Sequence, residues 1–162
     1  MLSMAVPLTS HYYSTHYQPI QAAKYAQLWP FLQPFLPAQP FSLLDVGIGP
    51  AWLEDFLYQK GVVFSRVVGV DVSEKAITPR KKNIDYFLSP SFTTAEKFDV
   101  VFCFDAWHCF PQMDLFSFVK KDGWLLVSEP LTYEKQLEKL PTWKRLLDVI
   151  VGEMEKSRVV LQ

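Results

Sequence analysis

Two glycines lie in this sequence where a bound molecule would need to approach the backbone. The segment SLLDVGIGPAWLEDFL, residues 42–57, places Gly47 and Gly49 where a short apolar run gives way to a helical pattern. Glycine permits a turn that a side chain would block, and it lets a ligand lie against the chain. The helix that follows would add free N–H groups and the positive end of its dipole. We therefore expect a cofactor to bind at this turn.

Two classes of cofactor commonly bind at such a turn, and the spacing of small residues separates them. The dinucleotide fingerprint is G-x-G-x-x-G/A, and its third small residue would fall at Trp52. A bulky indole there would crowd the pyrophosphate and the contact between helix and strand. The pattern for S-adenosylmethionine is D-x-G-x-G-x-G, and residues 45–51 read DVGIGPA, with Ala51 in the last place. A nucleotide-dependent oxidoreductase is therefore the less favoured alternative.

Apolar runs and helical spacings alternate along the chain. The predicted strands are residues 42–46, 66–70, 84–88, 98–104 and 124–129. The predicted helices are residues 20–33, 51–59, a short piece at 73–79, residues 113–121 and a long stretch at 134–156. Residues 157–162 fit one last strand. This alternation indicates an α/β fold with a doubly wound, mostly parallel, Rossmann-like sheet that is covered on both faces.

The glycine turn would lie at the carboxyl end of the first strand, where sheets of this kind bind their ligands. We expect residues 1–41 to form an N-terminal lid or helix and a proline-rich connector, and residues 42–162 to form the cofactor-binding domain. In the first helix, the predicted apolar face is marked by Ile20, Ala23, Ala26, Gln27/Leu28 and Phe31.

Composition sets limits on the class of protein. The chain has 162 residues, 49% of them hydrophobic and 15% aromatic, which suits one packed domain. The net charge of -1 gives no sign of nucleic-acid binding, although a nucleic acid stays open as an acceptor. No apolar run reaches the roughly 18 residues of a membrane span, and no signal peptide is evident, so we expect a cytoplasmic protein. Cys103 and Cys109 are too few for a structural zinc site, and we expect no metal.

Four segments resemble the motifs of class I S-adenosylmethionine-dependent methyltransferases. The first two are LLDVGIGPAWLEDFL at residues 43–57 and VVGVDVSEKAI at residues 67–77. The other two, FDVVFCFDAWHCF at 98–110 and LFSFVKKDGWLLVSEP at 115–130, resemble the type 11 branch of that family. The resemblance covers residues 42–130. It implies the strand order 3-2-1-4-5 and S-adenosylmethionine as cofactor.

The resemblance also implies which residues bind the cofactor. They are Asp45, Gly47, Gly49, Ala51, Asp71, Ser89 and Phe104. Asp71 would end the second strand, and it lies near the distance from Gly49 at which a ribose-binding acid is expected. Its two oxygens would accept hydrogen bonds from both ribose hydroxyls. Ser89, or the backbone beside it, would take the place of the acid that usually contacts adenine.

Other residues are candidates for the chemistry and for the substrate. Asp105 and His108, just past the fourth strand, are the catalytic candidates, with His108 either a base or a hydrogen-bonded residue of the pocket. Trp107 would form a wall of the substrate site or pack in the core. Tyr13 and Tyr17 would contact the substrate as part of a lid, unless the N-terminus is frayed.

We therefore expect methyl transfer to a small molecule, an RNA or a protein, which the sequence does not identify. The alternative is a non-catalytic subunit or cofactor-binding module that works with a partner. A short third-strand region and an early chain end, which predicts a missing closing hairpin and a sheet shortened at its C-terminal end, favour that alternative. The apolar run IDYFL, residues 84–88, lacks the lysines that protect a sheet edge. Such an edge can bind a protein partner, such as the activator subunit of some family members, or a second copy of the chain. The alternatives are that the N-terminal aromatic segment folds over this edge in the same chain, or that its side chains turn inward.

Overall fold

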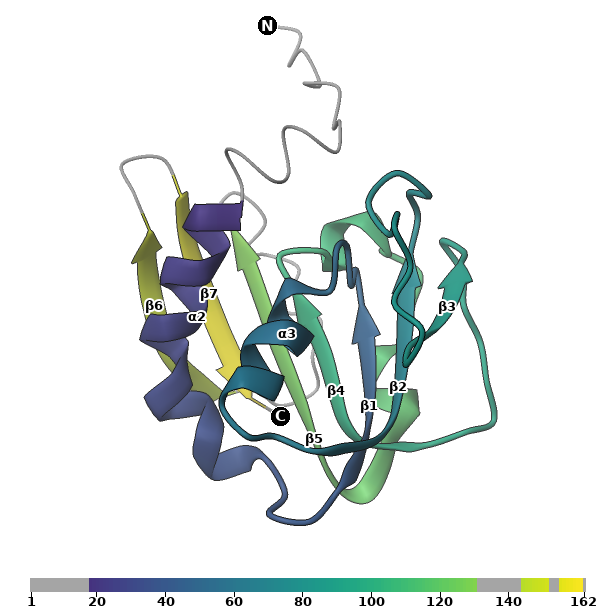
Figure 1. The fold of residues 1–162 in the computed structure, drawn as a ribbon, viewed down its shortest axis with the longest axis horizontal. Coiled ribbons are helices and arrows are strands. Elements are labelled where there is room, and N and C mark those ends of the chain that lie inside the picture. Colours follow the sequence, from purple (N-terminus) through teal and green to yellow (C-terminus); the bar gives the residue numbers. More distant parts are fainter. Residues whose placement is uncertain (1–17, 131–143, 152–154, 162) are drawn as a thin grey trace, which may run out of the picture.

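The structure, a computed structural model, describes residues 18–130, 144–151 and 155–161. Within these ranges one sheet has seven strands in the order β3-β2-β1-β4-β5-β7-β6 (Figure 1). The strands are β1 (Phe41–Val46), β2 (Phe64–Asp71), β3 (Asp85–Leu88), β4 (Phe98–Phe104), β5 (Val119–Pro130), β6 (Lys144–Val151) and β7 (Glu155–Leu161). Strands β1 to β5 pair in parallel, and β7 is antiparallel to both β5 and β6. The predicted parallel order 3-2-1-4-5 is confirmed.

Two α-helices cover one face of this sheet (Figure 1). They are α2 (Gln18–Leu32), which continues into the 3-10 helix η2 (Gln33–Phe35), and α3 (Trp52–Gln59). The core beneath them is apolar and includes Phe41, Leu43, Leu53, Leu57, Val67, Val100 and Phe102. Among the helices described, none is both long enough and apolar enough to cross a membrane.

The opposite face of the sheet is covered by irregular chain and two 3-10 helices. These helices are η3 (Trp107–Cys109) and η4 (Leu115–Phe118). Aromatic side chains fill much of this layer, and the buried ones are Phe92, Phe98, Trp107, Phe110 and Phe118. Large rings bury much apolar area per residue, so they can close a sheet face without the regular packing of a helix.

Two short helices predicted from the sequence are replaced by other structure. Residues 73–79 form turns and bends. Residues 113–121 contain only η4, because β5 already begins at Val119, which pairs with Phe98 of β4. A helix of one or two turns gains few internal hydrogen bonds, so turns and strand pairing readily take its place.

The C-terminal part of the sheet also differs from the prediction. The sequence predicts a helix over 134–156, but β6 and β7 form an antiparallel hairpin in the described part of this region. That helix prediction is wrong, whereas the last strand predicted at 157–162 is confirmed by β7. The expected loss of the closing hairpin and shortening of the sheet are wrong as well, since β7 extends the sheet beyond β5. Residues 149–151 are all β-branched, which favours a strand.

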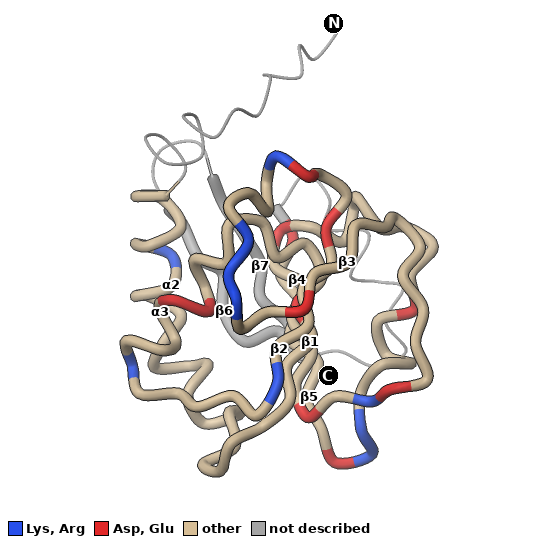
Figure 2. The backbone as a smooth tube through the Cα atoms, turned by 45° about the vertical axis from the view of Figure 1, so that its right-hand side comes forward, with Lys and Arg blue, Asp and Glu red and all other residues tan. Residues whose placement is uncertain are grey.

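Charges of both signs are mixed over the described backbone (Figure 2). The longest basic run, residues 80–82, includes Arg80, which pairs with Glu74 at 2.8 Å, and Lys81, which pairs with Asp55. These positive charges are therefore partly neutralised, as expected for a solvated surface.

The two glycines after β1 have different surroundings. Gly47 has a φ of 81°, and a Cβ placed there would lie only 2.1 Å from the Cβ of Ala106. Gly49 has a φ of 54°, and no heavy atom of a described residue lies within 4 Å of the place that its Cβ would take. Gly47 is thus required by the packing of the chain on itself, whereas Gly49 leaves open space beside the turn.

We expect Gly47→Ala to lower the free energy of unfolding by roughly 2–5 kcal/mol, because overpacking adds to the cost of a left-handed backbone. Gly49→Ala should lower it by only about 1–2 kcal/mol, the cost of the backbone conformation alone. Urea titration followed by circular dichroism measures both values. Equal losses for the two variants would contradict this difference in packing.

Candidate functional site

The carboxyl ends of β1, β2 and β4 surround one cavity of about 320 Å³. It lies at the position beside β1 that the sequence predicts. Six of the residues proposed from the sequence line it: Gly47, Gly49, Asp71, Phe104, Asp105 and His108. Tyr13 and Tyr17 lie outside the described residues.

Four other proposed residues are not among those that line this cavity: Asp45, Ala51, Ser89 and Trp107. The Ser89 N–H donates to the carbonyl of Asp71 at 2.9 Å, so Ser89 supports the end of β2 through its backbone. Trp107 is 5% exposed, and its indole N–H donates to the carbonyl of Met113 at 3.3 Å. Its position agrees with the alternative of plain core packing.

The carboxylate of Asp71 fastens the glycine turn to the end of β2. Its Oδ2 accepts a hydrogen bond from the Gly49 N–H at 2.9 Å. Its Oδ1 accepts from the N–H groups of Val72 and Ser73 at 2.8 and 2.9 Å. A carboxylate offers about four acceptor positions, so these three bonds fix its orientation and leave acceptor capacity toward the cavity.

Asp45 faces the buried Glu54 of α3 beneath the turn. The two side chains are 4% and 0% exposed, and neither oxygen of Glu54 accepts a hydrogen bond from a described N–H or O–H group. Burial raises the pKa of Asp45 well above its usual value, and the neighbouring Glu54 raises it further. Burial also raises the pKa of Glu54. When one of two such carboxyls keeps its proton, the repulsion between their negative charges is removed, so the pair can stay buried beneath the turn.

Asp105 is held in place by a buried lysine. Its φ of 53° is left-handed, and its N–H donates to the carbonyl of Ser128 at 2.7 Å. Its carboxylate forms an ion pair with Lys24 of α2 and accepts from the Ser128 hydroxyl at 3.0 Å. Lys24 and Ser128 are both 0% exposed. This cluster joins α2 to the ends of β4 and β5.

His108 forms an ion pair with a second buried residue. Its Nδ1 lies 3.0 Å from Oε2 of Glu129, which is 0% exposed. Hydrogen bonding to the Cys109 side chain and to Glu129 raises the pKa of His108 from 6.5 to about 10. The imidazole is therefore protonated at neutral pH and has no lone pair with which to accept a proton. The geometry favours a charged residue of the pocket over the base considered from the sequence.

The contribution of α2 to the cavity was missed in the sequence. The structure buries the helix face formed by Gln21, Lys24, Leu28 and Leu32. Of the predicted apolar positions, Leu28 is confirmed as buried. Ile20 is half-buried and the others, Ala23, Ala26 and Phe31, are exposed, so the buried face is rotated from the predicted one. The signal was present, because Gln21 and Lys24 precede Leu28 at helical spacing. Long polar side chains are usually assigned to the outer face, which hides such a pattern.

The sequence and the fold of this chain are both similar to those of known proteins. The sequence profile of a methyltransferase domain matches residues 13–151. No curated protein sequence matches the chain.

Three solved structures share the fold at 16% sequence identity. The ribosomal protein L11 methylase from Lactobacillus delbrueckii subsp. bulgaricus aligns with a TM-score of 0.61, covering 85% of this chain and 77% of that one. A protein from Pyrococcus horikoshii aligns at 0.60, covering 94% and 99%. Magnesium protoporphyrin IX methyltransferase from Synechocystis, crystallised with its S-adenosylmethionine, aligns at 0.57, covering 90% and 80%.

The stabilisation from protonated His108 should depend on pH. The pKa of His108 in the folded protein, about 10, lies above its ordinary value of 6.5. The stabilisation from the protonated ring is therefore full below pH 6.5 and is lost as pH rises through about 10. The difference in melting temperature between the wild type and His108→Gln should therefore narrow over that range. Both proteins share the other titrating groups, so circular dichroism melts at each pH isolate this residue. A difference that stays constant would show that the ion pair does not form.

Proposed function

Because this chain belongs to the methyltransferase domain family, we propose that it transfers a methyl group from S-adenosylmethionine to an acceptor. One observation carries the proposal: a single cavity brings together the open side of the glycine turn and the carboxylate of Asp71. The related fold crystallised with S-adenosylmethionine supports the choice of cofactor.

The residues around the turn fit this cofactor. The open space beside Gly49 allows a ligand to lie against the backbone, as a side chain would not. The remaining acceptor capacity of Asp71 suits two ribose hydroxyls. We assign Asp45 and Ala51 to the support of the turn rather than to direct contact, since both are buried and neither lines the cavity.

The protein has little proton chemistry to perform in this reaction. When bound, the cofactor would supply a methyl group on a positively charged sulfur. That sulfur would keep the electrons of the broken carbon–sulfur bond, an acceptor lone pair would form the new bond, and any acceptor proton would pass to bulk solvent. Phe104 and the paired side chains of Asp105 and His108 would align the acceptor and exclude water.

Isothermal titration calorimetry with S-adenosylmethionine, S-adenosylhomocysteine and NAD tests the proposal. We expect the first two to bind, and Asp71→Asn to weaken that binding by about 1.5–3 kcal/mol, the range for hydrogen bonds to a charged group. Glu74→Gln is a matched control, because it removes one acidic charge from the same loop at a site 55% exposed and paired with Arg80. Binding of NAD in their place, or unchanged affinity in Asp71→Asn, would refute the assignment.

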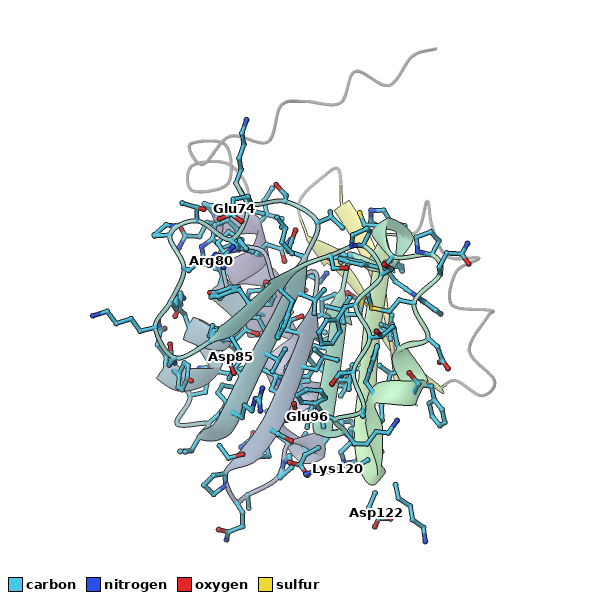
Figure 3. The ribbon with its side chains drawn as sticks, turned by 90° about the vertical axis from the view of Figure 1, so that its right-hand side faces the viewer. Glu74, Arg80, Asp85, Glu96, Lys120 and Asp122 are labelled. Atoms are coloured by element: carbon cyan, nitrogen blue, oxygen red, sulfur yellow. The ribbon has the colours of Figure 1, made fainter. Side chains whose placement is uncertain are left out.

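A partner at the β3 edge is a second proposal, and the exposure of this strand favours it. Strand β3 ends the sheet and pairs only with β2 among the described strands. Phe87 and Leu88 are 44% and 48% exposed. Figure 3 looks onto this edge, where Asp85 and Glu96 both pair with Arg66 at 3.3 Å. Charges thus protect one end of β3, while its apolar end stays open to another chain.

We expect the wild type to self-associate at high concentration and Phe87→Lys to reduce this association, as measured by light scattering. A lysine at the edge places a charge where another strand would pair. Phe116→Lys is the control, because Phe116 is 50% exposed on η4, away from the strand. A strictly monomeric wild type, or equal effects of the two variants, would count against pairing through β3.

A further inference from the structure

We propose that the methyl acceptor is an uncharged aromatic small molecule and that Gln21 of α2 binds its polar edge. This inference rests on the proposed methyltransferase function and names the class of acceptor for the same cavity. It follows from three properties of the cavity: its aromatic walls, the pairing of the charges of Asp105 and His108, and one polar side chain, Gln21, that has no hydrogen bond to another described residue.

The cavity has an acceptor wall, which we define as Gln21, Tyr25, Phe104, Asp105, His108 and Phe110. These residues come from α2 and from the chain at and after the end of β4. The glycine turn and the end of β2, where we place the cofactor, provide most of the rest of the lining. Three of the six side chains in the acceptor wall are aromatic rings, which offer flat apolar surfaces to a planar ligand.

Both charged side chains of the acceptor wall are already neutralised from behind. Asp105 pairs with Lys24, and His108 pairs with Glu129. Lys24 and Glu129 are each 0% exposed, so they belong to the interior rather than to the cavity. A charged group that entered would lose its hydration, and it would meet no unpaired opposite charge in the acceptor wall. The wall therefore favours an acceptor without charge.

Gln21 supplies the polar contact. It is 6% exposed and lines the cavity, and no hydrogen bond joins its amide to another described side chain or backbone group. Among the described residues only the carboxylate of Glu54 is both fully buried and without a hydrogen-bond partner, so the Gln21 amide is accessible from the cavity. A ligand that enters displaces water from this amide, and it binds well only if it makes the same hydrogen bonds. The amide can both donate and accept, which matches the hydroxyl or ring nitrogen of a neutral aromatic compound.

A base in an RNA chain would also offer a neutral ring, but its phosphates would need basic residues at the surface. In the loop that follows β2, the basic residues Arg80 and Lys81 are held in ion pairs with Glu74 and Asp55. The net charge of the chain is -1. A small molecule is therefore favoured over RNA.

Three phenols with one ring and different charges test the acceptor class. At pH 7, 4-methylphenol is neutral, 4-hydroxybenzoate is an anion and tyramine is a cation. Binding is measured by ligand-observed NMR on the full chain saturated with S-adenosylhomocysteine, with a short single-stranded RNA as a fourth probe. We expect 4-methylphenol to bind at least tenfold more tightly than the others. Tighter or equal binding of any other probe, or none by 4-methylphenol, overturns the inference. Failure of S-adenosylhomocysteine to bind would instead refute the proposed function on which it rests.

Variants of α2 test the part assigned to Gln21. Gln21→Leu keeps the size and removes the hydrogen bond, so it should weaken binding of 4-methylphenol roughly tenfold. The affinity for S-adenosylhomocysteine should change less than twofold. Gln27→Leu makes the same substitution on the exposed face of the helix and should change neither value. Equal losses for both ligands in Gln21→Leu would indicate a structural role and overturn the assignment.

Gln21→Glu provides a second, independent measurement. The new carboxylate has no counter-charge of its own in the wall, so this variant should bind tyramine more tightly than 4-methylphenol. Such a reversal of charge preference would be unaffected by a general loss of folded protein. An unchanged order of affinities would show that position 21 does not face the acceptor.

Discussion

The contact between the Gly49 N–H and the carboxylate of Asp71 is the constraint on which the site depends. It fixes the glycine turn after β1 against the end of β2, and the N–H groups that follow Asp71 hold the same carboxylate. On the other side of the turn, Gly47 has no room for a Cβ beside Ala106, so the turn also packs against the chain that follows β4. Three strand ends are thereby kept around one cavity before any ligand binds.

The charges of Asp105 and His108 at this cavity are stable because each has a buried partner from a different element. Lys24 of α2 reaches Asp105, and Glu129 of β5 reaches His108. Removing one partner of such a pair leaves an uncompensated charge, which costs far more than the pair itself contributes. The pairs therefore make the wall rigid and nearly neutral. A site of this kind orients a reactive cofactor and an acceptor without supplying acid or base chemistry.

The two faces of the sheet are buried by different kinds of structure. Helices α2 and α3 cover one face, while aromatic residues on short connections cover the other. The connections on either side of β3 have no α-helix, and β3 itself has only four residues. A short, partly apolar edge is the consequence. The hairpin of β6 and β7 closes the opposite side of the sheet beyond β5.

Sequence alone determined the parallel strands, the glycine turn and the place of Asp71, because each depends on neighbouring residues or on spacing within one β-α-β unit. Only the tertiary structure decided that Lys24 and Asp105, which are 81 positions apart, form a pair and that Gln21 faces the cavity. It likewise decided that Asp45 meets Glu54 and that residues 144–151 form a strand. Such outcomes depend on contacts between distant segments, and local propensity is weaker than those contacts.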